Sequence, residues 1–322
     1  MQPINIHYVT GNKGNVGKTN FSTALIEYYR QCNCGLIAID ADDDSKTLSQ
    51  TYKNSLKVLL SEKPALASQV DIVFRLAFAE TEKEVGRSDL LLDLPAGGEK
   101  IINKWMKECS LDQTAKEYNI KFTKWWVCDS DPLSIDLFQE SVEKQPDVDH
   151  IFLKNMGRSE DVSWKAFERR ASLKALIEKK SIPVLEIPAL DPEAISRIRT
   201  GHTTLERAAH RDYLKVNVTD HLRVKGWLMH TNDMIKNIIT LDEACQIVVP
   251  KVSETAPDKE SETAETSSEE EVSGKTKETK TTTSKTKKKA SAKTTAASKK
   301  KAPAESDVSE ADCQKKSTAV AK

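Results

Sequence analysis

Apolar residues along this chain form short continuous runs that alternate with segments of helical periodicity. Six runs have the length and composition of buried strands, at residues 4–10, 35–40, 89–94, 122–128, 149–155 and 182–187. Helical spacing of apolar positions fills the intervals at residues 19–31, 65–85, 132–143 and 162–179, and a last helical region covers roughly 216–249. Continuous apolar strands that alternate with helices are typical of parallel sheets. The pattern predicts an α/β fold, with a mostly parallel sheet and helices on both of its faces.

Glycine and acidic residues gather where the first three predicted strands end. A polar, glycine-containing loop, residues 11–18, follows the first strand, and the second strand ends in Asp40. The third strand carries Asp93 at its end, followed by Leu-Pro-Ala-Gly. Parallel α/β sheets bind their ligands at the carboxyl ends of the strands. We therefore expect a functional site at this edge of the sheet.

The composition changes sharply after residue 250. The 72 residues from 251 to 322 contain no Leu, Ile, Met, Phe, Trp or Tyr, so they cannot bury enough apolar surface to offset the entropy of ordering them. They hold 16 Lys and 13 acidic residues, which leaves 33 basic and 36 acidic residues in the first 250. The sequence predicts one domain at 1–250, large enough for a full core, and a disordered tail at 251–322.

The predicted tail has two blocks of opposite charge. Residues 254–271 carry eight acidic residues against one Lys, and residues 275–301 carry eleven Lys against one Glu. A solubilising linker is one interpretation. The other is a polycation that binds nucleic acid through phosphate contacts, without base stacking because the segment has no aromatic residue.

Several protein classes are excluded by simple counts. No run of about 18 apolar residues occurs, so no transmembrane helix is expected. The first residues lack the basic segment and following apolar segment of a secretory signal. Six Cys in 322 residues are too few for a disulfide scaffold. These features together predict a cytoplasmic protein.

The loop after the first strand has the chemistry of a phosphate-binding loop. A polyphosphate requires inward-facing backbone N–H groups, and Gly14, Gly17 and, among other residues, Asn15 tolerate the necessary backbone angles. A lysine at 18 can reach the β- and γ-phosphates, a threonine at 19 suits Mg²⁺, and the following helix directs its positive end toward the phosphates. The sequence thus predicts binding of ATP with Mg²⁺, through Gly14, Asn15, Val16, Gly17, Lys18, Thr19 and Asn20.

This loop departs from a strict P-loop, because Asn12 replaces a glycine and a second lysine, Lys13, precedes Lys18 by five residues. The segment KGNVGKT resembles the deviant Walker A motif, KGGxGK[ST], of the ParA/MinD group of ATPases. Four further segments resemble that group in the same order, over most of the first 210 residues. They are LIAIDADDD (36–44), LLLDLPAGG (90–98), FLKNMGR (152–158) and residues 187–208, the last being similar to plasmid-borne ParA-like proteins in particular.

The resemblance implies a P-loop ATPase that dimerises with ATP and hydrolyses it to ADP and phosphate. Lys13 matches the lysine that crosses the dimer interface to the partner's nucleotide, and Asp42 matches the acid that positions the attacking water. These two are the expected catalytic residues. Asn155 matches the position that reads the adenine edge. The resemblance implies that Mg²⁺ is held, partly through water, by Thr19, Asp93 and Asp40.

Two departures from the family pattern affect the expected rate. Asn15 replaces the second loop glycine, and Asp43-Asp44 follow Asp42 in place of the usual Pro-Gln. Asn15 narrows the range of backbone angles that the loop can adopt, and Asp43-Asp44 add negative charge beside the phosphates. We therefore expect slow turnover that a partner stimulates.

The family divides by what the nucleotide-bound dimer holds. We expect a ParA-like switch in plasmid or DNA partition or conjugative mobilisation, with an unidentified protein activator and possible association with the nucleoid. Non-specific DNA would be held by the Arg197–Arg211 region and the Lys-rich tail, and the tail has no apolar face for a membrane anchor. Two alternatives stay open: a nucleotide-dependent regulator of a protein partner without DNA binding, and a superfamily ligase or kinase acting on a small carboxylate.

Overall fold

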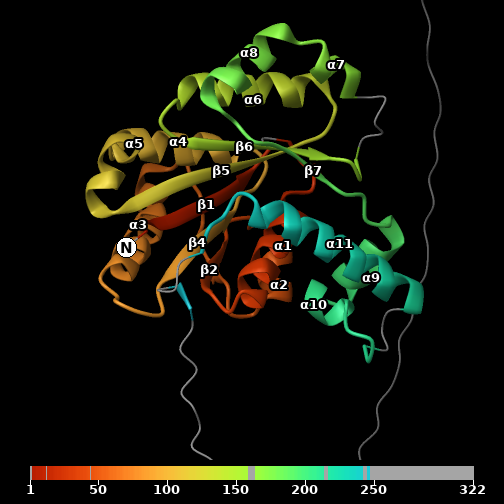
Figure 1. Ribbon diagram of the computed structural model, residues 1–322. Helices are drawn as coiled ribbons and strands as arrows, with labels where there is room; N and C mark the ends of the chain where they lie inside the picture. Colours follow the sequence, from red (N-terminus) through yellow and green to blue (C-terminus); the bar gives the residue numbers. More distant parts are fainter. Residues whose placement is uncertain are drawn as a thin grey trace, which may run out of the picture. The chain divides into compact units, whose positions relative to one another are not determined.

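A seven-stranded, fully parallel sheet organises the chain, with strand order β3-β2-β4-β1-β5-β6-β7. The computed structural model describes residues 2–11, 13–43, 45–158, 164–213, 217–241 and 245–246. Figure 1 shows the twisted sheet passing through the centre of this part of the chain. Its strands are β1 (Ile4–Thr10), β2 (Gly35–Asp40), β3 (Leu56–Lys57), β4 (Ser88–Asp93), β5 (Ile120–Cys128), β6 (Asp149–Asn155) and β7 (Val184–Ile187).

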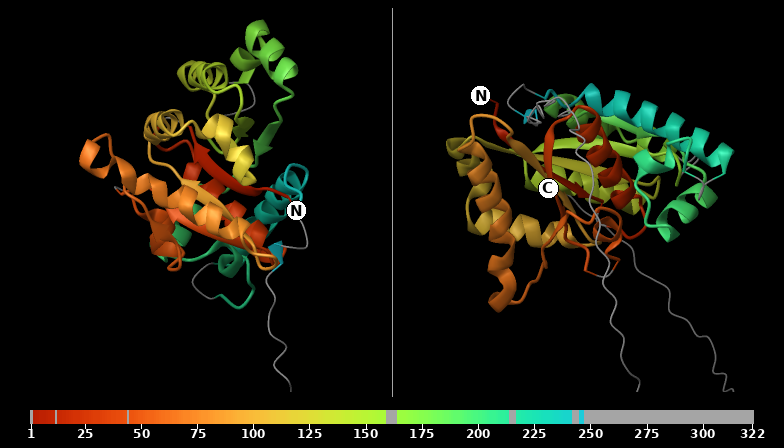
Figure 2. Two further views of the ribbon diagram at one scale, coloured as in Figure 1. Left: turned by 90° about the vertical axis from the view of Figure 1, so that its left-hand side faces the viewer. Right: turned by 90° about the horizontal axis from the view of Figure 1, so that it is seen from below.

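Helices cover both faces of the sheet, as the two views of Figure 2 show. One face is covered by α1 (Lys18–Gln31), α9 (Pro192–Thr200), α10 (Leu205–Ala208) and α11 (Val218–Lys236). The other face is covered by α3 (Asp71–Thr81), α4 (Gly98–Glu108) and α6 (Pro132–Lys144), followed by α7 (Lys165–Glu168) and α8 (Ala171–Lys180). Shorter elements are α2 (Thr47–Thr51), η1 (Pro64–Val70), α5 (Leu111–Thr114) and η2 (Ala115–Tyr118).

Successive strand residues supply the two cores, because side chains alternate across a sheet. Trp125 and Trp126 are both fully buried but belong to opposite cores. The Trp125 ring packs against Phe21 of α1, whereas the Trp126 ring packs against Phe138 of α6. Burying the strands on both faces explains why they appear in the sequence as unbroken apolar runs.

The predicted fold class and all six predicted strands are confirmed, with ends shifted by up to two residues. The predicted helix at 65–85 is wrong in its extent: a 3₁₀ segment precedes α3, which ends at Thr81. The helical region at 216–249 is shorter in the described residues, since α11 ends at Lys236. Helix α4 and the edge strand β3 were not predicted. The tail predicted at 251–322 lies outside the described residues.

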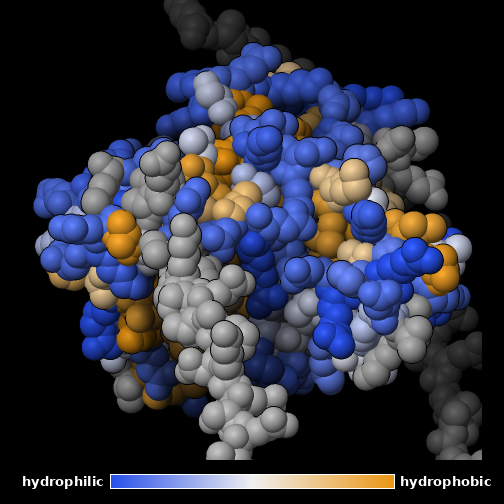
Figure 3. Space-filling model, turned by 60° about the horizontal axis from the view of Figure 1, so that its bottom comes forward, coloured by the Kyte–Doolittle hydropathy of each residue, from blue (hydrophilic) through white to orange (hydrophobic). Residues whose placement is uncertain are grey.

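The surface in Figure 3 is largely hydrophilic, with separate apolar patches. The large apolar side chains that are exposed include Val218, Leu222 and Met229 of α11. Within the part of the chain that the structure describes, no helix combines the length and the hydrophobicity that spanning a bilayer requires.

Candidate nucleotide site

The loop between β1 and α1 lies at the carboxyl edge of the sheet, where the sequence places it. Asn15 and Gly17 both adopt left-handed backbone angles, with φ of 61° and 105°, respectively. A Cβ at Gly17 would lie 2.3 Å from the Asn155 side-chain nitrogen, so this position requires glycine both for its angles and for its space. The loop runs directly into α1, whose unpaired N–H groups and positive dipole end suit phosphate.

Lys18 is buried at the start of α1, and its ammonium donates to the carbonyl of Lys13 at 2.9 Å. Burial lowers the pKa of Lys18, while the negative charges of Asp93 and Asp42 oppose that shift. The side chain therefore already lies within the loop, across the site that phosphates would fill. An anion arriving there would compensate a buried cation whose hydrogen bonding is otherwise met by one backbone carbonyl.

Asp93 ends β4 and is almost fully buried beside the same loop. It accepts hydrogen bonds from the hydroxyls of Thr19 and Ser22, the latter at 2.8 Å. Burial raises the pKa of Asp93 to about 7, against the lowering effect of these two hydrogen bonds. Asp40 lies close enough for its charge to raise the pKa of Asp93 further. The structure thus brings together three predicted metal-site residues, Thr19, Asp40 and Asp93.

These oxygen donors fit Mg²⁺, which prefers hard ligands and is held in many nucleotide sites by one or two carboxylates with substrate phosphates and water. Among the residues that the structure describes, no group of three or more His, Cys, Asp or Glu side chains is arranged to hold a metal ion. The hydroxyl of Thr19 and the carboxylates of Asp40 and Asp93 are donors of the kind that hold Mg²⁺ together with nucleotide phosphates.

Asp40 and Asp42 shape the segment that follows β2. One Asp40 oxygen accepts from the backbone N–H of Asp42 at 3.1 Å, and the other accepts from that of Ser49 in α2 at 2.8 Å. Asp42 in turn accepts from the backbone N–H of Ser45 at 3.1 Å. Asp40 therefore ties β2 to α2, and the Asp42 carboxylate sits close enough to Lys18 to influence its pKa.

The ammonium of Lys13 contacts carboxylates that lie outside the glycine loop. Its ammonium lies 2.9 Å from a carboxylate oxygen of Asp129 and 2.9 Å from one of Asp131, both just beyond the end of β5. These hydrogen bonds, that to Asp129 foremost, raise the pKa of Lys13. Neither acid was predicted as a site residue, although both follow a buried strand, which is the signal that identified Asp93. Within one chain, the two lysines of the motif thus contact different partners.

Asn155 connects the end of β6 to the loop. Its side-chain amide donates to the carbonyl of Val16 at 2.6 Å, and its side-chain oxygen accepts from the N–H of Gly157 at 3.0 Å. The predicted role of reading adenine remains a prediction. One amide hydrogen and one oxygen lone pair are left over for such contacts.

A pocket of about 280 Å³ opens beside Gly17, Asn20 and Asn155. Its apolar wall comes from Ile187, Pro188, Leu190, Ile195 and Trp227. The indole N–H of Trp227 donates to the carbonyl of Pro188 at 2.8 Å, so its hydrogen-bonding capacity is already used. A pocket with an apolar wall next to the glycine loop is suited to the base of a nucleotide.

The basic residues of the Arg197–Arg211 region make different contacts. Arg197 pairs with the buried carboxylate of Asp220 at 2.6 Å, and Arg207 lies over the ring of Tyr213. Arg199 donates to the side chain of Asn20 at 2.9 Å and lines the pocket. The predicted DNA-binding role of this run remains a prediction, and three of its arginines have partners within the fold.

No protein-family model matches the sequence. No curated protein matches it either.

Solved structures of MinD proteins are similar in fold to this chain. MinD of Aquifex aeolicus, in a MinC:MinD cell division complex, is 13% identical, with a TM-score of 0.43 over 74% of this chain and 99% of that one. MinD of Pyrococcus horikoshii OT3 with Mg-ADP is 13% identical, with a TM-score of 0.41 over 74% and 100%. A nucleotide-binding protein of Archaeoglobus fulgidus in complex with ADP is 17% identical, with a TM-score of 0.38 over 68% and 94%.

Proposed function

We propose that this chain is an ATP-dependent switch that hydrolyses ATP slowly and acts as a dimer in plasmid or DNA partition or conjugative mobilisation. The observation that carries the nucleotide assignment is the convergence of Lys18, Thr19 and Asp93 on one glycine loop at the start of α1. The DNA-related role rests on the sequence resemblance to ParA-like proteins and on the basic character of the Arg197–Arg211 region and the tail.

Each part of the site has a distinct task in this proposal. The loop N–H groups and Lys18 bind the phosphates, and the apolar pocket takes the base. Bound Mg²⁺ would neutralise phosphate charge, with Thr19 and Asp93 as the residues that hold it. Asp42 positions water, and catalysis consists mostly of positioning and charge stabilisation.

Lys13 gives the switch its dependence on a second subunit. Because Asp129 and Asp131 hold its ammonium, Lys13 must leave both carboxylates before it can reach any phosphate. In a closed dimer it would extend to the partner's nucleotide, where a desolvated cation stabilises developing negative charge. Hydrolysis would then loosen the dimer, because the phosphate that attracts this lysine is lost.

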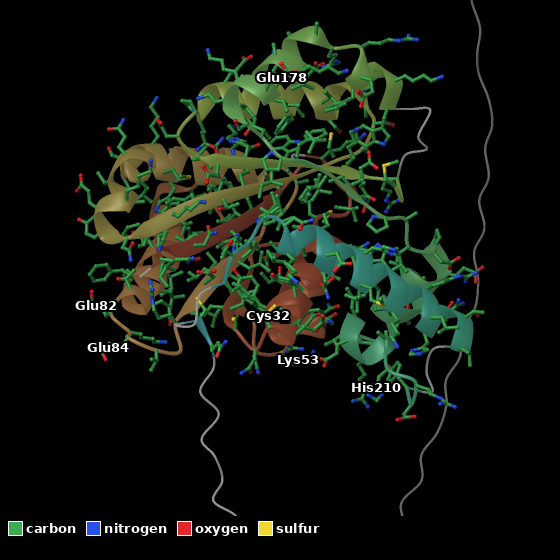
Figure 4. The ribbon with its side chains drawn as sticks, viewed as in Figure 1. Cys32, Lys53, Glu82, Glu84, Glu178 and His210 are labelled. Atoms are coloured by element: carbon green, nitrogen blue, oxygen red, sulfur yellow. The ribbon has the colours of Figure 1, made fainter. Side chains whose placement is uncertain are left out.

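The test is ATP turnover by the purified full-length chain, with and without non-specific double-stranded DNA. We expect DNA to stimulate the wild type, and the stimulation to vanish in Lys13→Ala and in Lys18→Ala. Lys53→Ala is the matched control, since Lys53 is exposed beyond α2 and lies at the edge of the molecule in Figure 4.

Three results would contradict the proposal in different ways. ATP turnover that does not change with DNA but rises with a protein partner favours a nucleotide-dependent regulator of that partner. Turnover that requires a small carboxylate favours a ligase or kinase. If DNA stimulates ATP turnover of Lys13→Ala as it does that of the wild type, Lys13 is not part of the catalytic site.

A further inference from the structure

The outer face of α11 exposes three large apolar side chains in one line. Val218, Leu222 and Met229 are 75%, 58% and 60% exposed, respectively. At 3.6 residues per turn, these positions fall within about 40° of one another around the helix axis. They form a stripe roughly 16 Å long, since a helix rises 1.5 Å per residue. These three side chains are called the α11 stripe below.

The folding of this chain uses the opposite face of the same helix. Val224 and Trp227 point away from the stripe and are buried in the core that α11 shares with α1. Figures 1 and 2 show α11 next to α1 on the outside of the molecule. Single exposed apolar residues are common on protein surfaces, whereas an aligned set of them is typical of interaction sites.

A glycine interrupts the helix beside the stripe. Gly226 lies one turn after Leu222 and three residues before Met229. A Cβ at Gly226 would meet no atom of the described residues within 4 Å, and its φ is not positive, so neither space nor backbone angle requires glycine here. Glycine inside a helix is destabilising relative to alanine. What it provides is a notch, where a second helix can approach the backbone closely.

The charge along this face is mostly positive. Lys225 and Lys236 are exposed and lie within about 60° of the stripe around the helix axis, and Asp233 is the exposed acid of α11. Two copies of this face would bring lysines together, which opposes self-association. Acidic side chains on a partner would complement the lysines. The notch at Gly226 favours a helix over lipid, because fluid acyl chains follow a surface without requiring a glycine.

We propose that the α11 stripe is the docking site for an acidic amphipathic helix of a protein partner. The apolar side chains of that helix pack on the stripe, and its backbone approaches α11 at Gly226. Its carboxylates lie beside Lys225 and Lys236, where they favour this partner over a basic one.

The same helix also reaches the nucleotide pocket. Trp227 follows Gly226 directly, lines the pocket of about 280 Å³ and donates to the carbonyl of Pro188 at 2.8 Å. A partner on the outer face of α11 therefore binds a helix whose inner face borders the proposed base site. Use of the stripe by the expected protein activator rests on the proposed function, whereas the docking itself does not.

The test is the binding of a synthetic peptide to the full-length chain without nucleotide, measured by fluorescence anisotropy. The acidic peptide is about three heptads long, with leucine at positions a and d and glutamate at e and g, and the matched peptide carries lysine at e and g. We expect the acidic peptide to bind about tenfold more tightly at low salt, because the two exposed lysines attract one peptide and repel the other. The difference should shrink as the salt concentration rises, since salt screens exposed charges.

Variants assign the binding to the stripe. Leu222→Glu combined with Met229→Glu should abolish binding of the acidic peptide, and because both side chains are exposed the core is left intact. Leu133→Glu is the matched control, since Leu133 is 59% exposed but lies on α6, on the other face of the sheet. Gly226→Ala should weaken binding about threefold or more without lowering stability in urea.

A charge reversal tests the choice of partner. In the combined variant Lys225→Glu and Lys236→Glu, the lysine peptide should bind more tightly than the acidic peptide, because the sign of the face is inverted. An unchanged preference would contradict the proposed role of the two lysines.

Several outcomes would overturn the docking proposal. They are equal affinity of the wild type for both peptides, no binding of either, and unchanged binding in the Leu222→Glu, Met229→Glu variant. Self-association of the wild type in sedimentation velocity that this variant abolishes would assign the stripe to a second copy instead. Co-sedimentation with phosphatidylserine–phosphatidylcholine vesicles that the variant abolishes would assign it to lipid. None of these results bears on the nucleotide function, which the ATP turnover assay tests separately.

Discussion

The Asn155 side chain is one of the contacts that hold the glycine loop to the rest of the sheet, and removing it should have a measurable cost. Asn155→Ala deletes two hydrogen bonds, one of 2.6 Å to the carbonyl of Val16 and one of 3.0 Å from the N–H of Gly157. Asn155 is only 8% exposed, so water replaces these partners poorly. Each lost bond costs about 1 kcal/mol, and a buried group left unpaired costs about as much or more.

We expect the free energy of unfolding of Asn155→Ala to fall by about 2 kcal/mol, which is roughly a 30-fold change in the unfolding equilibrium. The assay is urea unfolding without nucleotide, followed by the fluorescence of the buried tryptophans. Asn54→Ala in the exposed turn after α2 is the control, with an expected change below about 0.5 kcal/mol.

Asn155→Asp tests the direction of the bond to Val16. It keeps an acceptor for Gly157 but places a carboxylate against a carbonyl, so it should destabilise at least as much as Asn155→Ala. A loss of unfolding free energy below about 0.5 kcal/mol in Asn155→Ala would refute the role of Asn155 in holding the loop. A smaller loss in Asn155→Asp than in Asn155→Ala would also refute it.

Three further changes test other parts of the structure. Gly17→Ala should weaken ATP binding at least about tenfold in calorimetry, because alanine is strained at φ of 105° and its Cβ would meet the Asn155 side chain. The control Gly226→Ala, in an open part of α11, should bind ATP as the wild type does. Lys124→Met should lower the unfolding free energy by about 3–5 kcal/mol, because it leaves the buried carboxylate of Glu99 without its cation. Adding Glu99→Gln should recover most of that loss. Equal stability of the single and double variants would contradict the pairing. Burial, aided by the charge of Lys124, lowers the pKa of His150 to about 3, so this imidazole takes up a proton only on unfolding. From pH 6.5 to 4.5 the wild type should therefore lose about 2 kcal/mol more than His150→Gln in urea titrations, and parallel losses would contradict this prediction.

The parts of the site that lie close together in sequence could be predicted from it. The glycine loop, Lys18 and Thr19 are contiguous, and their chemistry follows from the strand before them and the helix after them. Asp93 could be predicted because an acid ending a buried strand has few structural explanations. Helix α4 also carries a local pattern, with Ile102, Trp105 and Met106 buried at helical spacing, although it was not predicted.

The contacts between distant segments could not be predicted, because they depend on the order of the strands. Lys13 meets Asp129 and Asp131 only because β1 and β5 are neighbours in the sheet, with Thr10 opposite Trp126. Apolar periodicity predicts that both segments are strands but contains no information on which strands pair. The same applies to Arg158 and Arg199, which reach one pocket from the end of β6 and from α9.

The charges of the site are distributed unevenly between its two ends, and this distribution constrains how a nucleotide could bind. At the phosphate end, carboxylates after β2, β4 and β5 surround the loop, and they engage or influence both lysines. Lys18 and the start of α1 attract the phosphates, and a divalent cation would offset the charge of the nearby carboxylates. At the base end, Arg158 and Arg199 are exposed residues that line the pocket, and Arg199 donates to the side chain of Asn20. This distribution favours a nucleotide that enters with Mg²⁺ on its 5′-phosphates.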